Sequence, residues 1–177
     1  MQICIYGAAS DEVDEKYLKA AEELGYQMAK RGHRLVFGGG ATGLMGAAAR
    51  GIIKGGGDML GIAPTFFRQP GILMEDYAQM IYTESMRERK RLMEEKSDAF
   101  VMTPGGIGTF EEFFEILTLK QLGRHNKPIA VMNVDGYYDK LLAFLDHAKS
   151  EGFLNRGCRE LFGVYDNAED LLIYLEK

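Results

Sequence analysis

Short apolar runs and longer helical patterns alternate along the whole chain, and this alternation restricts the possible fold more than any other feature. The apolar runs cover residues 3–6, 35–37, 59–63, 79–82, 99–103, 129–133 and 161–165. Apolar residues at helical spacing cover residues 15–31, 44–54, 86–96, 110–122, 137–151 and 168–175. Repeated strand–helix–strand units require a mostly parallel sheet with helices on both faces. The sequence therefore predicts an α/β, Rossmann-like, doubly wound domain of about seven strands flanked by helices.

Length and charge narrow the class of protein further. A chain of 177 residues fits a single domain, residues 1–177, with its own core. A net charge of −5 argues against a nucleic-acid binder, which shows a basic stripe, but permits a small phosphorylated ligand. Cys4 and Cys158 lie far apart, and the sequence shows no secretory signal and no apolar run of membrane-spanning length, so we expect a cytoplasmic protein that does not enter a membrane. The histidines, His33, His125 and His147, are scattered and predict no metal site.

Residues 38–43 form a first glycine loop, Gly-Gly-Gly-Ala-Thr-Gly, between an expected strand and an expected helix. Glycines at G-x-G-x-x-G spacing let the backbone approach a phosphate at the N-terminus of a helix. A site for NAD also needs an acidic residue at the end of the next strand, and residues 59–64 provide none. A dinucleotide site is therefore disfavoured, and two interpretations stay open: a phosphate loop, or a tight turn that lets helix and strand pack closely.

A second glycine loop, residues 103–109 (Thr-Pro-Gly-Gly-Ile-Gly-Thr), joins an expected strand to a helix. Its glycines leave backbone amides unobstructed for an anion, and the Thr109 hydroxyl can donate to the same anion. Glu111 and Glu112 follow in the first helical turn. The spacing from Thr109 to Glu112 also fits a capping box, with Thr109 as N-cap. The three glycines favour the anion site, because an ordinary helix start does not need them.

The expected helix at 86–96 opens with basic residues. Helical spacing places Met86, Arg89, Lys90 and Met93 on one side, while Arg87 points elsewhere. A cation between apolar side chains is a candidate to face a bound anion. The alternative is a solvated helix whose cations pair with its own glutamates.

Taken together, these motifs resemble those of the Lonely Guy family, the cytokinin riboside 5′-monophosphate phosphoribohydrolases, which were long mislabelled as lysine decarboxylases. Residues 104–112 match the family signature PGGxGTxxE, and Met86, Arg89 and Lys90 match its Met-x-x-Arg-Lys motif. Residues 38–46, 121–128 and 133–138 also look typical of the family, so the resemblance covers nearly the whole chain. One departure is Arg87, where many members have His.

The resemblance implies hydrolysis of the N-glycosidic bond of a purine riboside 5′-monophosphate, of the cytokinin type with an N6-substituted adenine, by a homodimer that needs no cofactor. Arg89 and Glu112 would form the catalytic pair. Glu112 would stabilise the positive charge that develops on the ribose and activate water, and Arg89 would stabilise the departing base. The other substrate-binding residues would be Met86, Lys90, Pro104, Gly105, Gly106, Ile107, Gly108, Thr109, Glu111, Gly39, Thr42, Gly43 and Ser10.

Three other functions compete with this one. Lysine decarboxylation needs a pyridoxal cofactor on a lysine, and no lysine stands in a suitable sequence setting. A non-enzymatic nucleotide or molybdenum-cofactor carrier of the same fold would use the glycine loops alone, and it would gain little from a carboxylate beside its anion. A broader AMP or GMP nucleosidase would share the chemistry and differ only in its base pocket.

Overall fold

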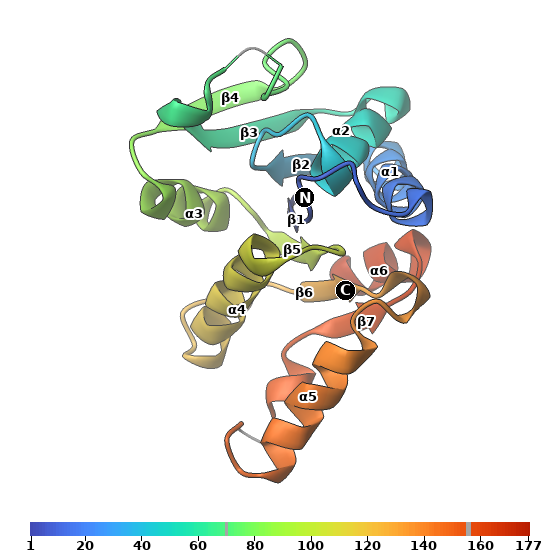
Figure 1. The fold of residues 1–177 in the computed structure, drawn as a ribbon, viewed down its shortest axis with the longest axis vertical. Coiled ribbons are helices and arrows are strands. Elements are labelled where there is room, and N and C mark those ends of the chain that lie inside the picture. Colours follow the sequence, from blue (N-terminus) through green and yellow to red (C-terminus); the bar gives the residue numbers. More distant parts are fainter. Residues whose placement is uncertain (70, 155–156) are drawn as a thin grey trace.

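Seven parallel strands form one sheet in the computed structural model, and helices cover both of its faces (Figure 1). The structure describes residues 1–69, 71–154 and 157–177. The strands lie in the order β4-β3-β2-β1-β5-β6-β7, and each neighbouring pair runs parallel. The expected Rossmann-like, doubly wound α/β fold is confirmed.

Strands and helices alternate along the chain. The strands are β1 (Gln2–Tyr6), β2 (Arg34–Phe37), β3 (Met59–Pro64), β4 (Gln79–Thr83), β5 (Ala99–Met102), β6 (Ile129–Met132) and β7 (Gly163–Tyr165). The α-helices are α1 (Glu15–Lys30), α2 (Gly43–Gly55), α3 (Met86–Glu95), α4 (Ile107–Gln121), α5 (Asp139–Ser150) and α6 (Ala168–Leu175). Short 3-10 helices lie at η1 (Thr65–Phe67), η2 (Val134–Gly136) and η3 (Cys158–Glu160).

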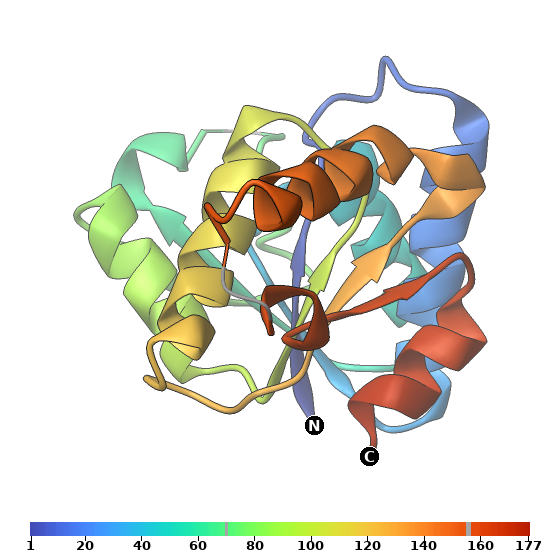
Figure 2. The same cartoon turned by 90° about the horizontal axis from the view of Figure 1, so that it is seen from below.

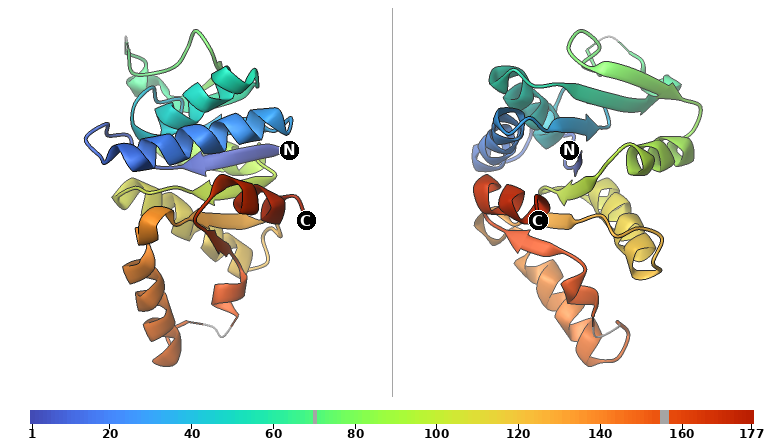
Figure 3. Two further views of the ribbon diagram at one scale, coloured as in Figure 1. Left: turned by 90° about the vertical axis from the view of Figure 1, so that its right-hand side faces the viewer. Right: turned by 180° about the vertical axis from the view of Figure 1, so that it is seen from behind.

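Alternate residues of each central strand enter two separate cores, one on each face of the sheet. In β1, Ile3 and Ile5 pack with apolar residues of α1, α2 and α6. Cys4 and Tyr6 point to the other face, where they pack with residues of α3, α4 and α5. Figures 2 and 3 show these helices on the two sides of the sheet. Because both faces are buried, the central strands are mostly apolar and not alternately polar.

The order of the strands determines where a ligand can bind. After β4, at one edge of the sheet, the chain returns through α3 to β5, which pairs with β1 in the middle. The loops that follow β1 and β5 therefore leave in opposite directions and open a crevice between them. Ligands of open α/β sheets bind in such a crevice, outside the carboxyl ends of the strands. Both glycine loops lie at this end of the sheet, since one follows β2 and the other follows β5.

Each range expected from the sequence overlaps an element of the structure, but three boundaries differ by more than one residue. Helix α4 begins at Ile107, with Gly106 as its N-cap and no side-chain cap. The capping-box interpretation of Thr109 was therefore wrong: the glycine loop itself starts the helix, so Thr109 lies inside the first turn. Strand β7 begins at Gly163, after η3, and α5 begins at Asp139, after η2, so both elements are shorter than expected.

Two features concern the described residues as a whole. No helix among residues 1–69, 71–154 and 157–177 is long and apolar enough to cross a membrane. In the same part of the chain, no group of three or more His, Cys, Asp or Glu side chains could hold a metal ion.

Candidate active site

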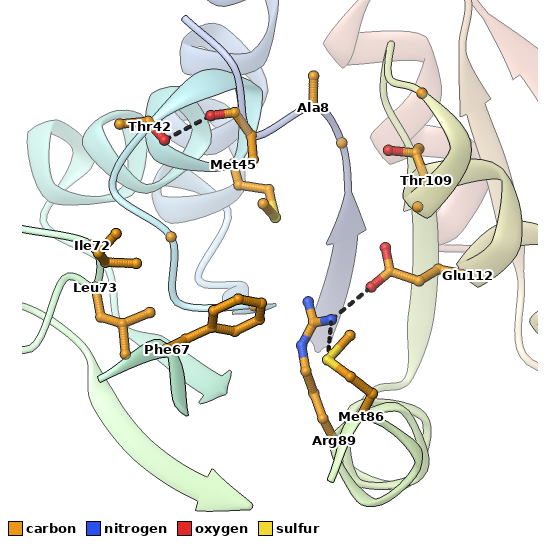
Figure 4. Close-up of a pocket in the computed structure, with 16 residues that line it drawn as sticks. Ala8, Thr42, Met45, Phe67, Ile72, Leu73, Met86, Arg89, Thr109 and Glu112 are labelled. Atoms are coloured by element: carbon orange, nitrogen blue, oxygen red, sulfur yellow. Dashed lines mark hydrogen bonds and ion pairs between the residues drawn. The ribbon is translucent and has the colours of Figure 1, made fainter. Parts of the chain in front are cut away.

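A pocket of about 360 Å³ opens at the carboxyl end of the sheet, where the loops after β1, β2, β3 and β5 meet (Figure 4). Its volume lies in the range of small-molecule sites, roughly 300–1,000 Å³. Met45, Phe67, Ile72 and Leu73 line one side, which is apolar. The other side carries polar groups from α3 and α4. A ligand with an apolar part and an anionic part fits such a pocket.

Arg89 and Glu112 form a buried ion pair on the polar side of this pocket. Arg89 Nη1 lies 3.2 Å from Glu112 Oε1, and the two residues are 7% and 9% exposed. Arg89 Nε also donates to the carbonyl of Ile62 in β3, at 3.2 Å. This bond fixes the guanidinium on the sheet, so that both charged groups face the pocket (Figure 4). A buried pair held in this way is a common feature of catalytic sites.

Burial raises the pKa of Glu112 above its usual value of 4.5. The neighbouring Arg89 opposes that rise by favouring the ionised form, and Lys90 opposes it more weakly. Glu111 and Glu115 add to the rise. A carboxylate with a raised pKa accepts a proton from water more readily than an ordinary surface glutamate does, which suits a general base.

The first glycine loop makes room for Arg89. A side chain at Gly38 would place its Cβ 2.3 Å from Arg89 Nη2, so only glycine fits beneath the guanidinium. Gly39 (φ 78°) and Gly43 (φ 62°) adopt left-handed backbone conformations that favour glycine. Neither of these two lines the pocket, so they match the tight-turn interpretation, whereas Gly38 and Thr42 do line it.

The second glycine loop presents an open helix N-terminus to the pocket. The first intrahelical bond of α4 runs from Phe110 N to Gly106 O, at 3.0 Å, so the preceding amides lack helical partners. A Cβ at Gly106 or Gly108 would meet no atom within 4 Å, so packing within the protein does not demand glycine there. Thr109, in the same turn, also lines the pocket. Free amides and the positive end of the helix dipole make this helix N-terminus a candidate anion site.

The loop after β1 lies between the two glycine loops and forms hydrogen bonds with residues in or directly after each of them. Ala8 N donates to Pro104 O at 3.1 Å, and Ala8 O accepts from Leu44 N at 2.8 Å. The Thr42 hydroxyl donates to Ala9 O at 2.6 Å. These bonds fix the backbone that separates the apolar side of the pocket from the anion site.

The structure divides the residues expected at the site into two groups. Those that line the pocket are Thr42, Met86, Arg89, Gly106, Gly108, Thr109 and Glu112. Those that lie outside its lining are Ser10, Gly39, Gly43, Lys90, Pro104, Gly105, Ile107 and Glu111.

Several residues of the second group either bind other residues or face solvent. Lys90 forms ion pairs with Glu111 and with Glu115, the latter at 2.8 Å, and these pairs lie between α3 and α4, outside the lining of the pocket. Ile107 is 82% exposed. The Ser10 hydroxyl accepts from Glu12 N at 3.1 Å.

Sequence reasoning missed the residues of the loop after β1 and the apolar side of the pocket. Gly7, Ala8 and Ala9 directly follow β1, so the rule that ligands bind at carboxyl ends of strands was a usable signal for them. Phe67 and Leu73 lie in an irregular segment after β3 that shows no strand or helix periodicity. Nothing in their local pattern pointed to the pocket.

The fold and the pocket define a Rossmann-like protein in which the N-terminus of α4 opens to the pocket beside a buried arginine–carboxylate pair. A family model described as "Possible lysine decarboxylase" matches residues 45–175. The chain is 40% identical over 176 residues to cytokinin riboside 5′-monophosphate phosphoribohydrolase LOG2 of Arabidopsis thaliana, covering 99% of this chain and 83% of that protein. It is 38% identical over 176 residues to the enzyme LOG of Oryza sativa subsp. japonica, with 99% and 73% covered. The chain belongs to the Lonely Guy family.

Solved structures of lower sequence similarity share the fold. A molybdenum cofactor binding protein from Rippkaea orientalis matches with a TM-score of 0.74 at 22% identity, over 99% of this chain and 94% of that one. A Moco carrier protein from Chlamydomonas reinhardtii matches with a TM-score of 0.73 at 23% identity, over the same shares. At these identities the likeness concerns the fold alone.

Proposed function

We propose that this protein hydrolyses the N-glycosidic bond of a cytokinin-type purine riboside 5′-monophosphate, giving the free base and ribose 5-phosphate. The observation that carries the proposal is the position of Glu112. Its buried carboxylate lies one helical turn beyond Thr109 on α4, and it lines the same pocket as Thr109 and the apolar side chains. Relatives with this activity in their names are about 40% identical over nearly the whole chain.

The nucleotide would bind with its phosphate at the N-terminus of α4. Amides of Gly106 and Gly108 and the Thr109 hydroxyl donate to the phosphate oxygens. The purine then lies towards Met45, Phe67 and Leu73, whose side chains suit an apolar substituent on the base. Binding energy from the phosphate is used to orient the reacting bond beside Glu112.

In the reaction, the bond between the anomeric carbon and the base nitrogen breaks, and its electron pair leaves with the base. The Glu112 carboxylate stabilises the positive charge that develops on the ribose. It also accepts a proton from the attacking water, whose oxygen bonds to the anomeric carbon. Arg89 stabilises the negative charge that develops on the base, and the base then takes up a proton. Because an arginine side chain keeps its proton in proteins, Arg89 acts as a fixed charge and not as an acid.

Lysine decarboxylation, which the name of the family model suggests, is poorly supported by the lysines of this structure. A Schiff-base lysine needs a lowered pKa. At Lys90, burial lowers the pKa, but hydrogen bonds to Glu111 and Glu115 outweigh that effect and the pKa is raised. Burial lowers the pKa of Lys120, but neither this lysine nor any other in the described part of the chain lines the pocket.

The proposal also includes a homodimer, a single domain and a cytoplasmic location. Family membership supports a homodimer, and the length supports one domain over residues 1–177. The free, buried Cys4 and Cys158 agree with a reducing cytoplasm.

Incubation with AMP and with N6-isopentenyladenosine 5′-monophosphate tests the function, with free base and ribose 5-phosphate followed by chromatography. Faster release from the prenylated nucleotide, and none from the matching nucleosides, is the expected result. Equal or faster release from AMP would favour the broader nucleosidase. Binding of nucleotides without any base release would favour a carrier.

A further inference from the structure

The direction of one peptide group decides whether the phosphate loop can bind an anion. The carbonyl of Gly105 and the N–H of Gly106 belong to the same trans peptide, so they point in opposite directions. Gly106 is the N-cap of α4 and lines the pocket, whereas Gly105 is buried behind it. A group that holds the Gly105 carbonyl on the side away from the pocket therefore directs the Gly106 amide towards it.

Tyr137 provides such a group. Its hydroxyl donates to Gly105 O at 2.8 Å. The next residue, Tyr138, donates to Thr103 O at 2.7 Å, two residues earlier in the same loop. Two adjacent phenols from the segment after β6 thus bind alternate carbonyls of the glycine loop. Neither tyrosine lines the pocket, so their contact with the site runs through the backbone of the loop.

The segment that carries the tyrosines has a conformation that few sequences adopt. Asp135 has a φ of 52°, in the left-handed region that non-glycine residues rarely occupy, and Gly136 follows with a φ of 70°. Asn133 closes the turn by accepting from Tyr138 N at 2.7 Å. This turn places both tyrosine hydroxyls against the glycine loop.

We propose that Tyr137 is a positioning residue for phosphate binding: its hydroxyl fixes the Gly105–Gly106 peptide so that the Gly106 amide donates to the 5′-phosphate. The inference deepens the proposed function and rests on it for the identity of the phosphate. Tyr138 supports the same loop from a fully buried position. Tyr137 is 41% exposed, so its hydroxyl can be removed without opening the core.

The test compares Tyr137→Phe with the unaltered protein. Loss of one orienting hydrogen bond is expected to lower kcat/KM for a nucleoside 5′-monophosphate about tenfold. The dissociation constant of ribose 5-phosphate, measured by calorimetry, rises by the same factor, while that of adenosine does not change. Loss of phosphate affinity alone separates a positioning role from a general loss of structure, which would weaken both ligands.

Tyr17→Phe is the matched control. The Tyr17 ring packs edge-on against the Tyr137 ring, with the ring centroids 5.5 Å apart, and its hydroxyl forms no hydrogen bond with residues 103–109 in the described part of the chain. Its variant is expected to bind ribose 5-phosphate normally. Equal losses in both variants, or no loss in Tyr137→Phe, overturn the inference, as does an unaltered protein that fails to bind ribose 5-phosphate. A protein that binds ribose 5-phosphate but releases no base refutes the proposed function alone.

Discussion

The carboxylate of Glu112 lies 3.2 Å from the guanidinium of Arg89, and each group comes from a different helix on the same face of the sheet. The pair is nearly sealed from solvent, yet both residues line the pocket. A buried ion pair is weak evidence for stability, because desolvation offsets the attraction. Its position beside the proposed anion site instead indicates a role in catalysis.

Replacing Glu112 with Gln is expected to lower kcat by about 10²–10⁴-fold, the usual contribution of a general acid or base. The amide keeps the shape of the side chain but cannot accept a proton from water. Single-turnover measurements with the nucleotide give the rate, and equilibrium binding of AMP shows whether the pocket is intact. Glu115→Gln is the control on the same helix, because Glu115 pairs with Lys90 outside the pocket. Near-normal turnover in a folded Glu112→Gln protein would refute the assigned role.

The pH dependence of kcat/KM should report the environment of Glu112. Its raised pKa means that activity is lost as the pH falls through a value above 4.5. Arg89 lowers that pKa, so Arg89→Met should shift the acidic limb to higher pH while also reducing the rate. Arg91→Met is the control, because Arg91 pairs with the exposed Glu95 on the same helix. An acidic limb that stays in place would show that another group titrates.

Gly38→Ala is expected to reduce activity although Gly38 takes no part in the chemistry. The new Cβ would lie 2.3 Å from Arg89 Nη2 and displace the guanidinium. A double-mutant cycle with Arg89→Ala measures this dependence, because coupled residues are not additive. In the protein that keeps Arg89, Gly38→Ala should lower kcat/KM by roughly tenfold or more, which corresponds to about 1.4 kcal/mol. In the Arg89→Ala variant, the same substitution should have almost no effect on kcat/KM. Equal costs in both backgrounds would place the effect elsewhere in the loop.

Gly108→Ala should stabilise the protein and weaken its binding of ribose 5-phosphate. Gly108 is in the first turn of α4, and a Cβ there meets no protein atom within 4 Å. Alanine is the better helix former, so the free energy of unfolding should rise by about 0.5–1 kcal/mol. The methyl group occupies space beside the phosphate, so the dissociation constant of ribose 5-phosphate should increase. Denaturant titration and calorimetry measure the two effects, and unchanged affinity would remove Gly108 from the anion site.

The sheet and its helices were predictable because the central strands are buried on both faces and the helices between strands show regular apolar spacing. The glycine loops were predictable as motifs, but their local geometry was not. Thr109 and Glu112 fit a capping box, and the alternative start at Ile107 depends on the backbone conformation of Gly106, which sequence spacing does not reveal. Helix boundaries are the least certain part of any reading from periodicity.

The different partners of Lys90 and Arg89 could not be predicted from the sequence. Helical spacing places both on one broad side of α3, and only the structure distinguishes them. Arg89 points to Ile62 and Glu112, whereas Lys90 turns towards Glu111 and Glu115 of α4. Such partners come from residues more than twenty positions away, so they depend on how helices pack and not on local pattern.

The crevice between the loops that follow β1 and β5 has a consequence for the stability of the whole domain. A nucleotide in the pocket would touch segments as distant in sequence as Ala8 and Glu112, and so would act as a reversible crosslink between the two halves of the sheet. Ligands that bind only the folded state stabilise it in proportion to the logarithm of their concentration. Amide hydrogen exchange should therefore slow in β2 and in β5 together when the nucleotide is added, although these strands are not neighbours.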